Sequence, residues 1–269
     1  MIYAEEIYAG IEQVRAKSPL VHNITNFVVM NNTANALLAM GASPVMAHAW
    51  EEVEDMVAIA SALVINMGTL SDEWVKSMLK AGRKAKETNT PIVFDPVGVG
   101  ATPYRTEVAQ KIIQECKPDI IRGNASEIMA LNHSNIKTKG VDSTETGDTA
   151  LASAKELAVN THSVVVISGA TDFITDGKNV AKVSNGAPIM TKVTGMGCTA
   201  TAVVGAFAGV EKDMFKAAIM GMVCMGICGE IANVKSAGPG SIPENFLNQL
   251  YLIDKLNIES NLKLEYESL

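Results

Sequence analysis

A loop with two glycines, leading into a predicted helix, carries the residues best suited to binding an anion. Residues 193–200 read VTGMGCTA, in which Gly195 and Gly197 permit positive φ angles and close approach of a ligand. The free N–H groups at a helix start, together with the helix dipole, attract anions. Such a loop can stabilise a phosphoryl group while charge moves during transfer. A glycine-rich turn selected only for helix packing explains the same residues equally well.

An aspartate at the end of an apolar run is a second candidate for chemistry. Asp95-Pro96 follows the apolar residues 92–94 and precedes the segment VGVG. Ligands bind beyond the carboxyl ends of parallel strands, so a carboxylate at this position faces a crevice. Asp95 is therefore a candidate ligand of magnesium, directly or through water. The alternative is a turn aspartate that precedes a helix.

A third polar group, RGNASE at residues 122–127, follows the predicted strand at residues 119–121. Asn124 is a good helix N-cap, and Glu127 then occupies the N3 position, which is an arrangement with a purely structural explanation. In the functional interpretation, Glu127 organises magnesium and water, and Arg122 contacts phosphate. The residues by themselves favour the structural explanation.

Polar side chains also cluster near the N-terminus, at His22-Asn23-Ile24-Thr25-Asn26. His22 alone is more typical of a core residue than of a catalyst. A dense polar cluster followed by a helix of small and apolar residues nevertheless suits the orientation of a small ligand. Met46, at the end of the next predicted strand, offers a soft apolar wall for such a ligand.

The four cysteines, Cys116, Cys198, Cys224 and Cys228, form neither a disulfide framework nor a zinc motif. Cys224 and Cys228 share one helix face, but their segment supplies too few further ligands for a metal site, so we expect both in the core. Cys198 differs because it stands at a helix start. The N–H dipoles there are expected to lower the pKa of its thiol.

Short apolar runs that alternate with longer helical patterns must position these groups. We expect strands at residues 43–46, 62–66, 92–94, 119–121 and 164–167, mostly continuous apolar runs typical of strands covered on both faces. Helical patterns occupy residues 51–60, 72–88, 106–115, 198–208 and 213–234. Asp176-Gly177 is a turn signal that predicts an antiparallel excursion at residues 173–180. The alternation predicts an α/β fold with a mostly parallel central sheet and helices on both faces, in a single domain of residues 1–269.

Composition and charge exclude several classes of protein. Of the 269 residues, 48% are hydrophobic and 19% charged, which is a globular rather than a disordered balance. The net charge of −7 argues against sequence-independent binding of nucleic acid, which needs a cationic surface. The uncharged run at residues 217–229 is too short for a membrane span and is typical of a core helix. The N-terminus carries glutamates where a signal peptide has cationic and apolar regions, so we expect a cytoplasmic protein.

The order and spacing of these motifs resemble the hydroxyethylthiazole kinases of thiamine salvage. The matching text is PLVHNITN at residues 19–26, ASPVMA at 42–47, DPVGVG at 95–100, RGNASE at 122–127 and TGMGC at 194–198. The resemblance implies a ribokinase-like fold and phosphorylation of the primary alcohol of 4-methyl-5-(2-hydroxyethyl)thiazole by ATP with Mg²⁺. It also implies a homotrimer with active sites at subunit interfaces.

The same resemblance implies roles for individual residues. Asn26, Met46 and Gly68 are expected to line the thiazole pocket, with Gly195 and Cys198 near the alcohol. Asp95 and Glu127 are expected to organise magnesium. The residues expected to bind ATP are Arg122, Asn124 and Ser168. The resemblance also implies that three residues at the helix start are catalytic: Gly195, Gly197 and Cys198.

Two positions depart from common patterns. Ser168 stands where family members often have threonine, and either hydroxyl can donate to a phosphate. Cys198 stands where the wider superfamily usually has an aspartate as base, although cysteine is familiar among the thiazole kinases. Whether Cys198 acts as a base, a nucleophile or a group that shapes the pocket stays open. The chain has no GxxxxGK[ST] motif, so it is not a P-loop kinase. Phosphoryl transfer would depend mainly on positioning and charge stabilisation.

Three other functions would use parts of the same motifs. A nucleotide-dependent lyase or repair dehydratase would use the anion loop but not the polar cluster at residues 22–26. A non-catalytic protein that binds a nucleotide or a thiamine precursor would not need Asp95, Glu127 and the Gly195 loop together. A thiol redox protein would need a partner for Cys198, and the sequence has no CxxC motif.

Overall fold

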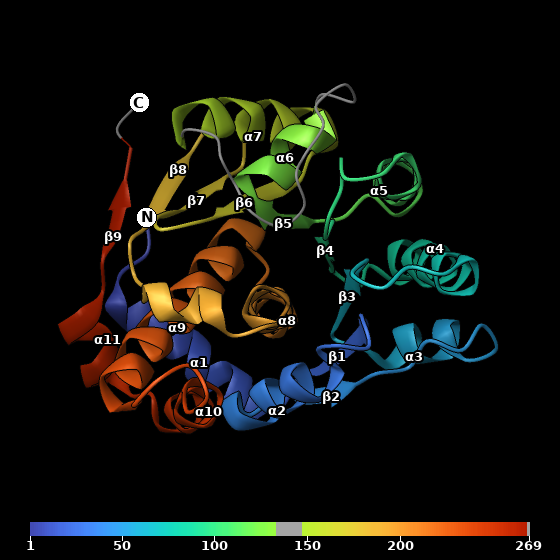
Figure 1. The fold of residues 1–269 in the computed structure, drawn as a ribbon. Helices are drawn as coiled ribbons and strands as arrows, with labels where there is room; N and C mark the ends of the chain where they lie inside the picture. The colour runs from blue at the N-terminus through green and yellow to red at the C-terminus, as the bar shows by residue number, and fades with distance from the viewer. Residues whose placement is uncertain (133–146, 268–269) are drawn as a thin grey trace.

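The computed structural model describes residues 1–132 and 147–267, and nine strands in those ranges form one sheet. The strands are β1 (Leu20–Ile24), β2 (Ser43–Val45), β3 (Ala62–Asn66), β4 (Ile92–Asp95), β5 (Ile120–Asn124), β6 (Val164–Ser168), β7 (Asp172–Thr175), β8 (Val180–Val183) and β9 (Leu264–Tyr266). Their order across the sheet is β2-β1-β3-β4-β5-β6-β7-β8-β9 (Figure 1). Strands β1 to β6 pair in parallel, whereas β7, β8 and β9 are added antiparallel at one side. The prediction of a mostly parallel sheet is therefore confirmed.

The register of the parallel strands aligns their carboxyl ends. Asn66 of β3 pairs with Asp95 of β4, and Asn124 of β5 pairs with Ser168 of β6. The rest of β3, β4 and β6 is apolar and buried, because helices cover both faces of the sheet. Each of these four strands ends in a polar residue, so polar side chains gather at one edge of an otherwise apolar sheet.

Helices pack on both faces of the sheet, as predicted (Figure 1). One face carries α1 (Ala4–Lys17), α2 (Met30–Met40), α8 (Met196–Ala208), α9 (Met214–Lys235), α10 (Ile242–Leu252) and α11 (Lys255–Asn261). The other face carries α3 (Val53–Ile59), α4 (Asp72–Thr88), α5 (Pro103–Cys116), α6 (Ala125–Asn132) and α7 (Gly147–Thr161). Side chains cap the starts of two of these helices: Ser71 accepts a hydrogen bond from Trp74 N at the start of α4, and Asp213 accepts from Phe215 N at the start of α9.

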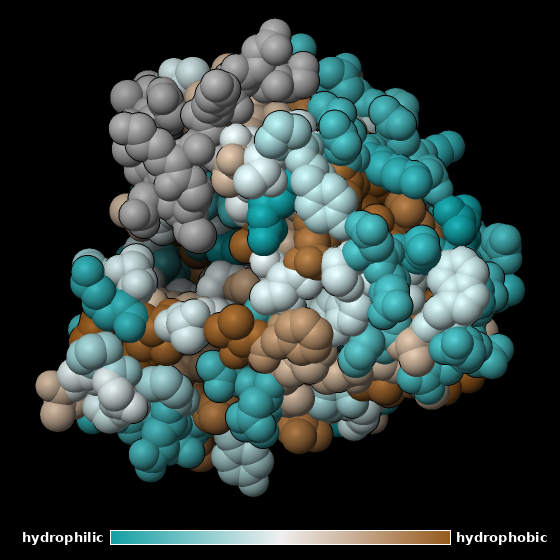
Figure 2. All heavy atoms as spheres, turned by 45° about the vertical axis from the view of Figure 1, so that its right-hand side comes forward, coloured by the Kyte–Doolittle hydropathy of each residue, from teal (hydrophilic) through white to brown (hydrophobic). Residues whose placement is uncertain are grey.

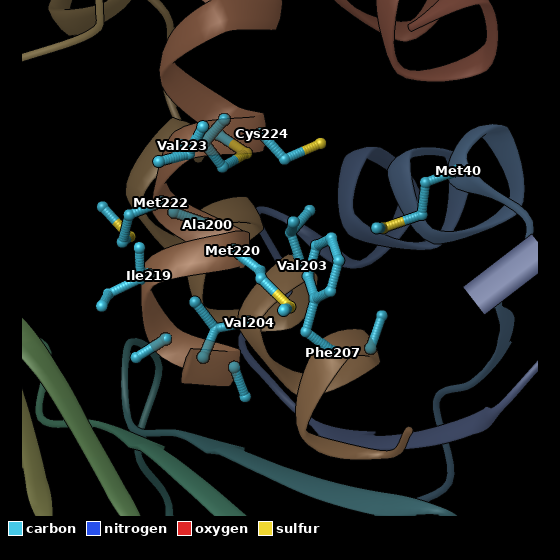
Figure 3. Close-up of a cluster of buried hydrophobic side chains, with 14 of the residues drawn as sticks. Met40, Ala200, Val203, Val204, Phe207, Ile219, Met220, Met222, Val223 and Cys224 are labelled. Carbon is cyan, nitrogen blue, oxygen red and sulfur yellow. The ribbon is translucent and has the colours of Figure 1, made fainter. Parts of the chain in front are cut away.

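Helices α8 and α9 form the centre of one core layer (Figure 3). Val204 of α8 and Met220 of α9 lie in this cluster, and a Cβ on Gly221 would come within 2.8 Å of Val204 Cα, so glycine permits the close approach of the two helices. Cys224 and Cys228 are buried in the same layer, as predicted. Among the described residues, α9 is the one helix long and apolar enough to cross a membrane, but 78% of that apolar window is buried inside the protein. Its placement confirms the prediction of a core helix.

The strands β1 and β9 and the helices α1, α7, α10 and α11 lie outside the sequence-based expectations. Polar His22 and Asn23 interrupt the apolar pattern of β1, yet both are buried because the strand lies between two others. Strand β9 pairs with β8, and the N–H of Ile2 donates to the Tyr266 hydroxyl at 2.8 Å, so the two ends of the chain meet. The predicted antiparallel excursion is confirmed as the β7–β8 hairpin, in which Gly177 has a φ of 94°.

Candidate active site

The carboxyl edge of the parallel strands collects most of the residues singled out in the sequence. In chain order they are Asn26 after β1, Gly68 after β3, Asp95 at the end of β4, Arg122 and Asn124 on β5, Glu127 on α6 and Ser168 at the end of β6. Helix α8 packs against β1, β3 and β4, and it begins with Gly195 as N-cap, followed by Gly197 and Cys198 in its first turn. This edge is where ligands bind in open α/β sheets.

A chain of hydrogen bonds connects the start of α8 with the ends of three strands. Asn26 Nδ2 donates to Asn66 Oδ1 at 2.8 Å and to Cys198 Sγ at 3.5 Å. Asn66 Nδ2 donates in turn to Asp95 Oδ2 at 2.8 Å. Thr201 Oγ1 donates to the same Asp95 oxygen at 2.7 Å. The residues expected to bind the acceptor and the residue expected to bind magnesium are therefore linked by direct contacts.

Three glycines of the site allow this close packing. Gly195 has a φ of 84°, a left-handed conformation that favours glycine. A Cβ on Gly197 would lie 2.8 Å from Arg122 Nη1, and a Cβ on Gly68 would lie 2.6 Å from Asn26 Nδ2. A larger residue at position 68 or 197 would thus displace a side chain of the site.

Asp95 and Glu127 form a buried acidic pair beside Arg122. Burial raises the pKa of Asp95, although Arg122 Nη1 lies 3.9 Å from Asp95 Oδ2 and acts in the opposite direction. Burial and the nearby Asp95 raise the pKa of Glu127 to about 7, against the effect of hydrogen bonds from Gly98 N and Asn124 N, both at 2.8 Å. Within the described residues, Asp95 Oδ1 is buried and accepts no hydrogen bond. The positive charge supplied by the described chain therefore compensates the two carboxylates only in part.

The thiol of Cys198 does not have the lowered pKa expected at a helix start. Burial, followed by the negative charge of Asp95, raises the pKa of Cys198 to about 11. The expectation is wrong because it considered the helix alone, whereas tertiary packing buries the sulfur next to a carboxylate. Cys198 is therefore a neutral thiol near pH 7, and its sulfur accepts the amide N–H of Asn26.

The residues expected to bind nucleotide lie along the same edge, toward β6. Ser168 Oγ donates to the carbonyl of Gly123 at 3.2 Å. Asn124 Oδ1 accepts from Glu127 N at 2.9 Å while the Asn124 N–H donates to Glu127, which confirms the predicted N-cap arrangement. Asp172, at the start of β7, is buried and accepts from Gly169 N at 2.9 Å. Burial raises the pKa of Asp172 to about 7.

Met46 directly follows β2, the strand at the end of the sheet. The segment after it is held against β1, because His22 Nε2 donates to the carbonyl of Ala47 at 2.7 Å. Burial lowers the pKa of His22, which is consistent with the core role favoured for it. The ring centroids of Phe27, directly after Asn26, and Trp74 of α4 lie 4.6 Å apart.

Large apolar side chains reach the surface beside the site. Phe27 and Val28, directly after Asn26, are 66% and 60% exposed. Figure 2 shows apolar side chains, in brown, among the hydrophilic side chains on the face of the molecule that it presents. Unpaired apolar surface of this kind is typical of a region that contacts another molecule.

Three further residues of the site were not identified from the sequence. Asn66 ends an apolar strand as Asp95 does, and this shared position is a signal that could have identified it. Thr201 lies one turn after Cys198 on α8, which places both side chains on the same face of the helix. Arg105 donates to the carbonyls of Met67, Gly68 and Val97 at 2.7 Å and holds the loops after β3 and β4 together. No local pattern distinguishes Arg105 from a surface arginine.

Comparison with known proteins agrees with this geometry. Residues 11–256 match the model of the hydroxyethylthiazole kinase family. A hydroxyethylthiazole kinase of Leptospira biflexa is 56% identical over 252 residues, which cover 94% of each chain. The solved structure of a hydroxyethylthiazole kinase from Pyrococcus horikoshii OT3 superposes with a TM-score of 0.90 at 41% identity, covering 98% of this chain and 100% of that one.

A more distant structure bears on the fold alone. A ribokinase-like superfamily protein from Enterococcus faecalis superposes with a TM-score of 0.59 at 13% identity, covering 86% of each chain. The expected ribokinase-like fold is thereby confirmed. From the match over most of its length and the identity to curated relatives, we conclude that the chain belongs to the hydroxyethylthiazole kinase family.

Proposed function

We propose that this protein transfers the γ-phosphoryl group of ATP to the primary alcohol of 4-methyl-5-(2-hydroxyethyl)thiazole, which forms the thiazole phosphate for thiamine salvage. Membership of the kinase family supports the reaction. The observation that carries it is the contact between Asn26 and Cys198, because it joins the acceptor side of the site to the helix start that receives the phosphoryl group.

In this proposal the acceptor lies near Asn26, Met46 and Gly68, with its hydroxyl toward the α8 loop. The free N–H groups at the start of α8 face the phosphoryl group as negative charge moves, and Arg122 lies beside the loop at Gly197. Ser168 and Asn124 bind the nucleotide, together with Arg122. Because Cys198 is a neutral thiol, it shapes the pocket instead of removing the hydroxyl proton.

Magnesium fits the two carboxylates of the site. Asp95 Oδ1 is a buried oxygen that accepts no hydrogen bond in the described part of the chain, so it is available to a cation. Both oxygens of Glu127 already accept backbone N–H groups, so Glu127 would hold a coordinated water. No cluster of three or more His, Cys, Asp or Glu side chains suits a metal within residues 1–132 and 147–267, which agrees with an ion that takes its other ligands from water and phosphate. When bound, magnesium neutralises the phosphate charge.

The protein is further proposed to act as a cytoplasmic homotrimer of single-domain subunits with active sites at the subunit interfaces. The exposed Phe27 and Val28 support this arrangement, since they follow Asn26 directly and offer apolar surface at the rim of the site. A Phe27→Asp variant should shift the mass measured by sedimentation from trimer to monomer. A parent protein that sediments as a monomer at assay concentration would contradict the arrangement.

One assay tests the proposed function against its competitors. Purified protein is incubated with ATP, Mg²⁺ and the thiazole alcohol, and ADP and thiazole phosphate are measured. Stoichiometric formation of both products supports the kinase. Repair of a hydrated nucleotide without phosphoryl transfer would favour the dehydratase alternative, and thiazole binding without turnover would favour a binding protein.

A further inference from the structure

Asn66 occupies the junction between the two halves of the proposed site. It lies at the carboxyl end of β3 and is 1% exposed. Its Oδ1 accepts from Asn26 Nδ2 at 2.8 Å and from Gly68 N at 3.0 Å. Its Nδ2 donates to Asp95 Oδ2 at 2.8 Å. The amide oxygen of Asn66 thus contacts residues of the proposed thiazole pocket, Asn26 and Gly68, and the amide nitrogen contacts the carboxylate of Asp95.

The direction of this amide cannot be reversed without loss of contacts. A reversed Asn66 would set its oxygen against the Asp95 carboxylate and its NH₂ group against the Nδ2 donor of Asn26. A buried polar group left without a partner is costly, so one orientation is strongly preferred. The contacts of Asn66 therefore determine how the side chains on either side of it are oriented.

Asp95 receives its orientation from two donors on a single oxygen. Oδ2 accepts from Asn66 at 2.8 Å and from Thr201 at 2.7 Å, whereas Oδ1 accepts no hydrogen bond among the described residues. Because both donors hold Oδ2, Oδ1 is the carboxylate oxygen that is left available to a cation or a coordinated water. Neither donor is close to Asp95 in sequence, so the orientation is a product of the fold.

We propose that Asn66 is a positioning residue that aligns the Asp95 carboxylate for phosphoryl transfer and, through its opposite end, holds Asn26 in the orientation that receives the thiazole. This inference rests on the proposed function. It assigns Asn66 no contact with either substrate, and its effect is expected through Asp95 and Asn26.

The variant Asn66→Asp separates the two ends of the side chain. It keeps an oxygen that accepts from Asn26 and Gly68, but it replaces the N–H donor that faces Asp95. The new carboxyl group either is ionised or shares a proton with Asp95. In both cases it changes the charge next to Asp95 Oδ2 and the orientation of the Asp95 carboxylate. We expect kcat to fall by about 10- to 100-fold, the usual effect of removing a residue that orients a ligand of the reacting group. The calorimetric affinity for the thiazole alcohol, measured without ATP, should change little.

A double variant and a matched control separate positioning from stability. Asn66→Asp with Asp95→Asn restores one donor and one carboxylate to the pair but moves the charge to β3, so Tm should recover while kcat should not. Asn185→Asp is the control, because Asn185 is also buried, its Nδ2 donates to the carboxylate of Glu230 at 3.2 Å, and its Oδ1 accepts from Lys263 N, partners that do not belong to the proposed site. It should share the loss of Tm and leave the kcat of the folded fraction unchanged.

The outcomes distinguish this inference from the proposed function. A fall in kcat of Asn66→Asp with thiazole affinity retained supports it. A kcat equal to that of the parent, or an equal loss of kcat, thiazole affinity and Tm, as in a purely structural role, overturns it. Recovery of kcat in the double variant also overturns it. If the parent neither binds nor phosphorylates the thiazole, the proposed function fails and this inference fails with it.

Discussion

The sulfur of Cys198 lies 3.5 Å from the Nδ2 of Asn26, although 172 residues separate the two positions in the chain. The contact joins the start of α8 to the end of β1. It brings the anion loop against Asn26, the last residue of the polar cluster at residues 22–26, and the two motifs become one site. Burial and the nearby Asp95 raise the pKa of the Cys198 thiol, whereas the hydrogen bond from Asn26 acts in the opposite direction.

Cys198→Ala should retain measurable kinase activity, and Cys198→Asp should also be active. The pKa of the thiol is about 11, so no thiolate is present to act as base at neutral pH. For the same reason, kcat of the parent should show no rise from thiol ionisation between about pH 6 and 9. The measurement is kcat at saturating ATP across that range for the parent and both variants. Inactive alanine and aspartate variants that still fold and bind both ligands would show that the sulfur is required.

Asp95→Asn and Glu127→Gln should each lower kcat far more than they weaken thiazole binding. Their charge is needed mainly while the phosphoryl group moves, so the loss is expected in the transition state. Steady-state kinetics at saturating Mg²⁺ and calorimetry with the thiazole check the two halves of this expectation. Glu115→Gln is a suitable control, because Glu115 is a carboxylate on α5 that pairs with Arg83 at the surface. Near-normal kcat in both site variants would contradict the magnesium assignment.

Asn26→Ala should weaken binding of the thiazole and leave ATP binding nearly intact. Asn26 contacts Asn66 and Cys198 on the acceptor side, whereas Arg122 and Ser168 lie on other strands. Calorimetric titration of each ligand separately is the measurement. Asn35→Ala on α2 serves as control, since Asn35 is exposed and contacts Asn31. Equal losses of both ligands would assign Asn26 to the fold instead of to the acceptor.

Asp172→Asn should make the protein more stable than the parent above neutral pH. The folded pKa of Asp172 is about 7 against 3.8 for the free side chain, so the folded state holds a proton that the unfolded state has lost. The protonated Asp172 therefore stabilises the folded state fully below about pH 4. As the pH rises toward 7 this contribution to the free energy of unfolding is lost, by at most about 1.4 kcal/mol for each pH unit. Asparagine lacks this titration, and its oxygen still accepts from Gly169 N.

Urea unfolding of parent and variant at several pH values between about 4 and 8 measures this difference. Asp176→Asn, in the turn of the same hairpin, is the control. Burial acts to raise the pKa of Asp176, but hydrogen bonds from Asn179 and Lys178 lower it overall. Its substitution should therefore cost stability above the pKa of a free aspartate. If the free energies of unfolding of the parent and of Asp172→Asn differed by the same amount at every pH in this range, burial would not be raising the pKa of Asp172.

The sequence by itself determined the family, the layered fold and most of the candidate site. Continuous apolar runs identified β3, β4 and β6 because strands covered on both faces carry few polar residues. Positions such as Asp95 were recognisable because a polar residue ending such a run lies at the edge where ligands bind. The N-cap pair Asn124 and Glu127 was recognisable since capping depends on residues three apart.

The tertiary structure alone decided which of these residues touch and what charge they carry. The pKa of Cys198 is raised instead of lowered because Asp95 and the surrounding packing come from distant segments. Asn66 and Thr201 acquire their importance only when β3, β4 and α8 are brought together around one carboxylate oxygen. Strand β1 lacks a continuous apolar pattern because it carries the buried His22, whose Nε2 donates to the carbonyl of Ala47, a contact set by the fold. Local sequence encodes elements and their polar ends, whereas burial, pairing and pKa depend on neighbours that are distant in the chain.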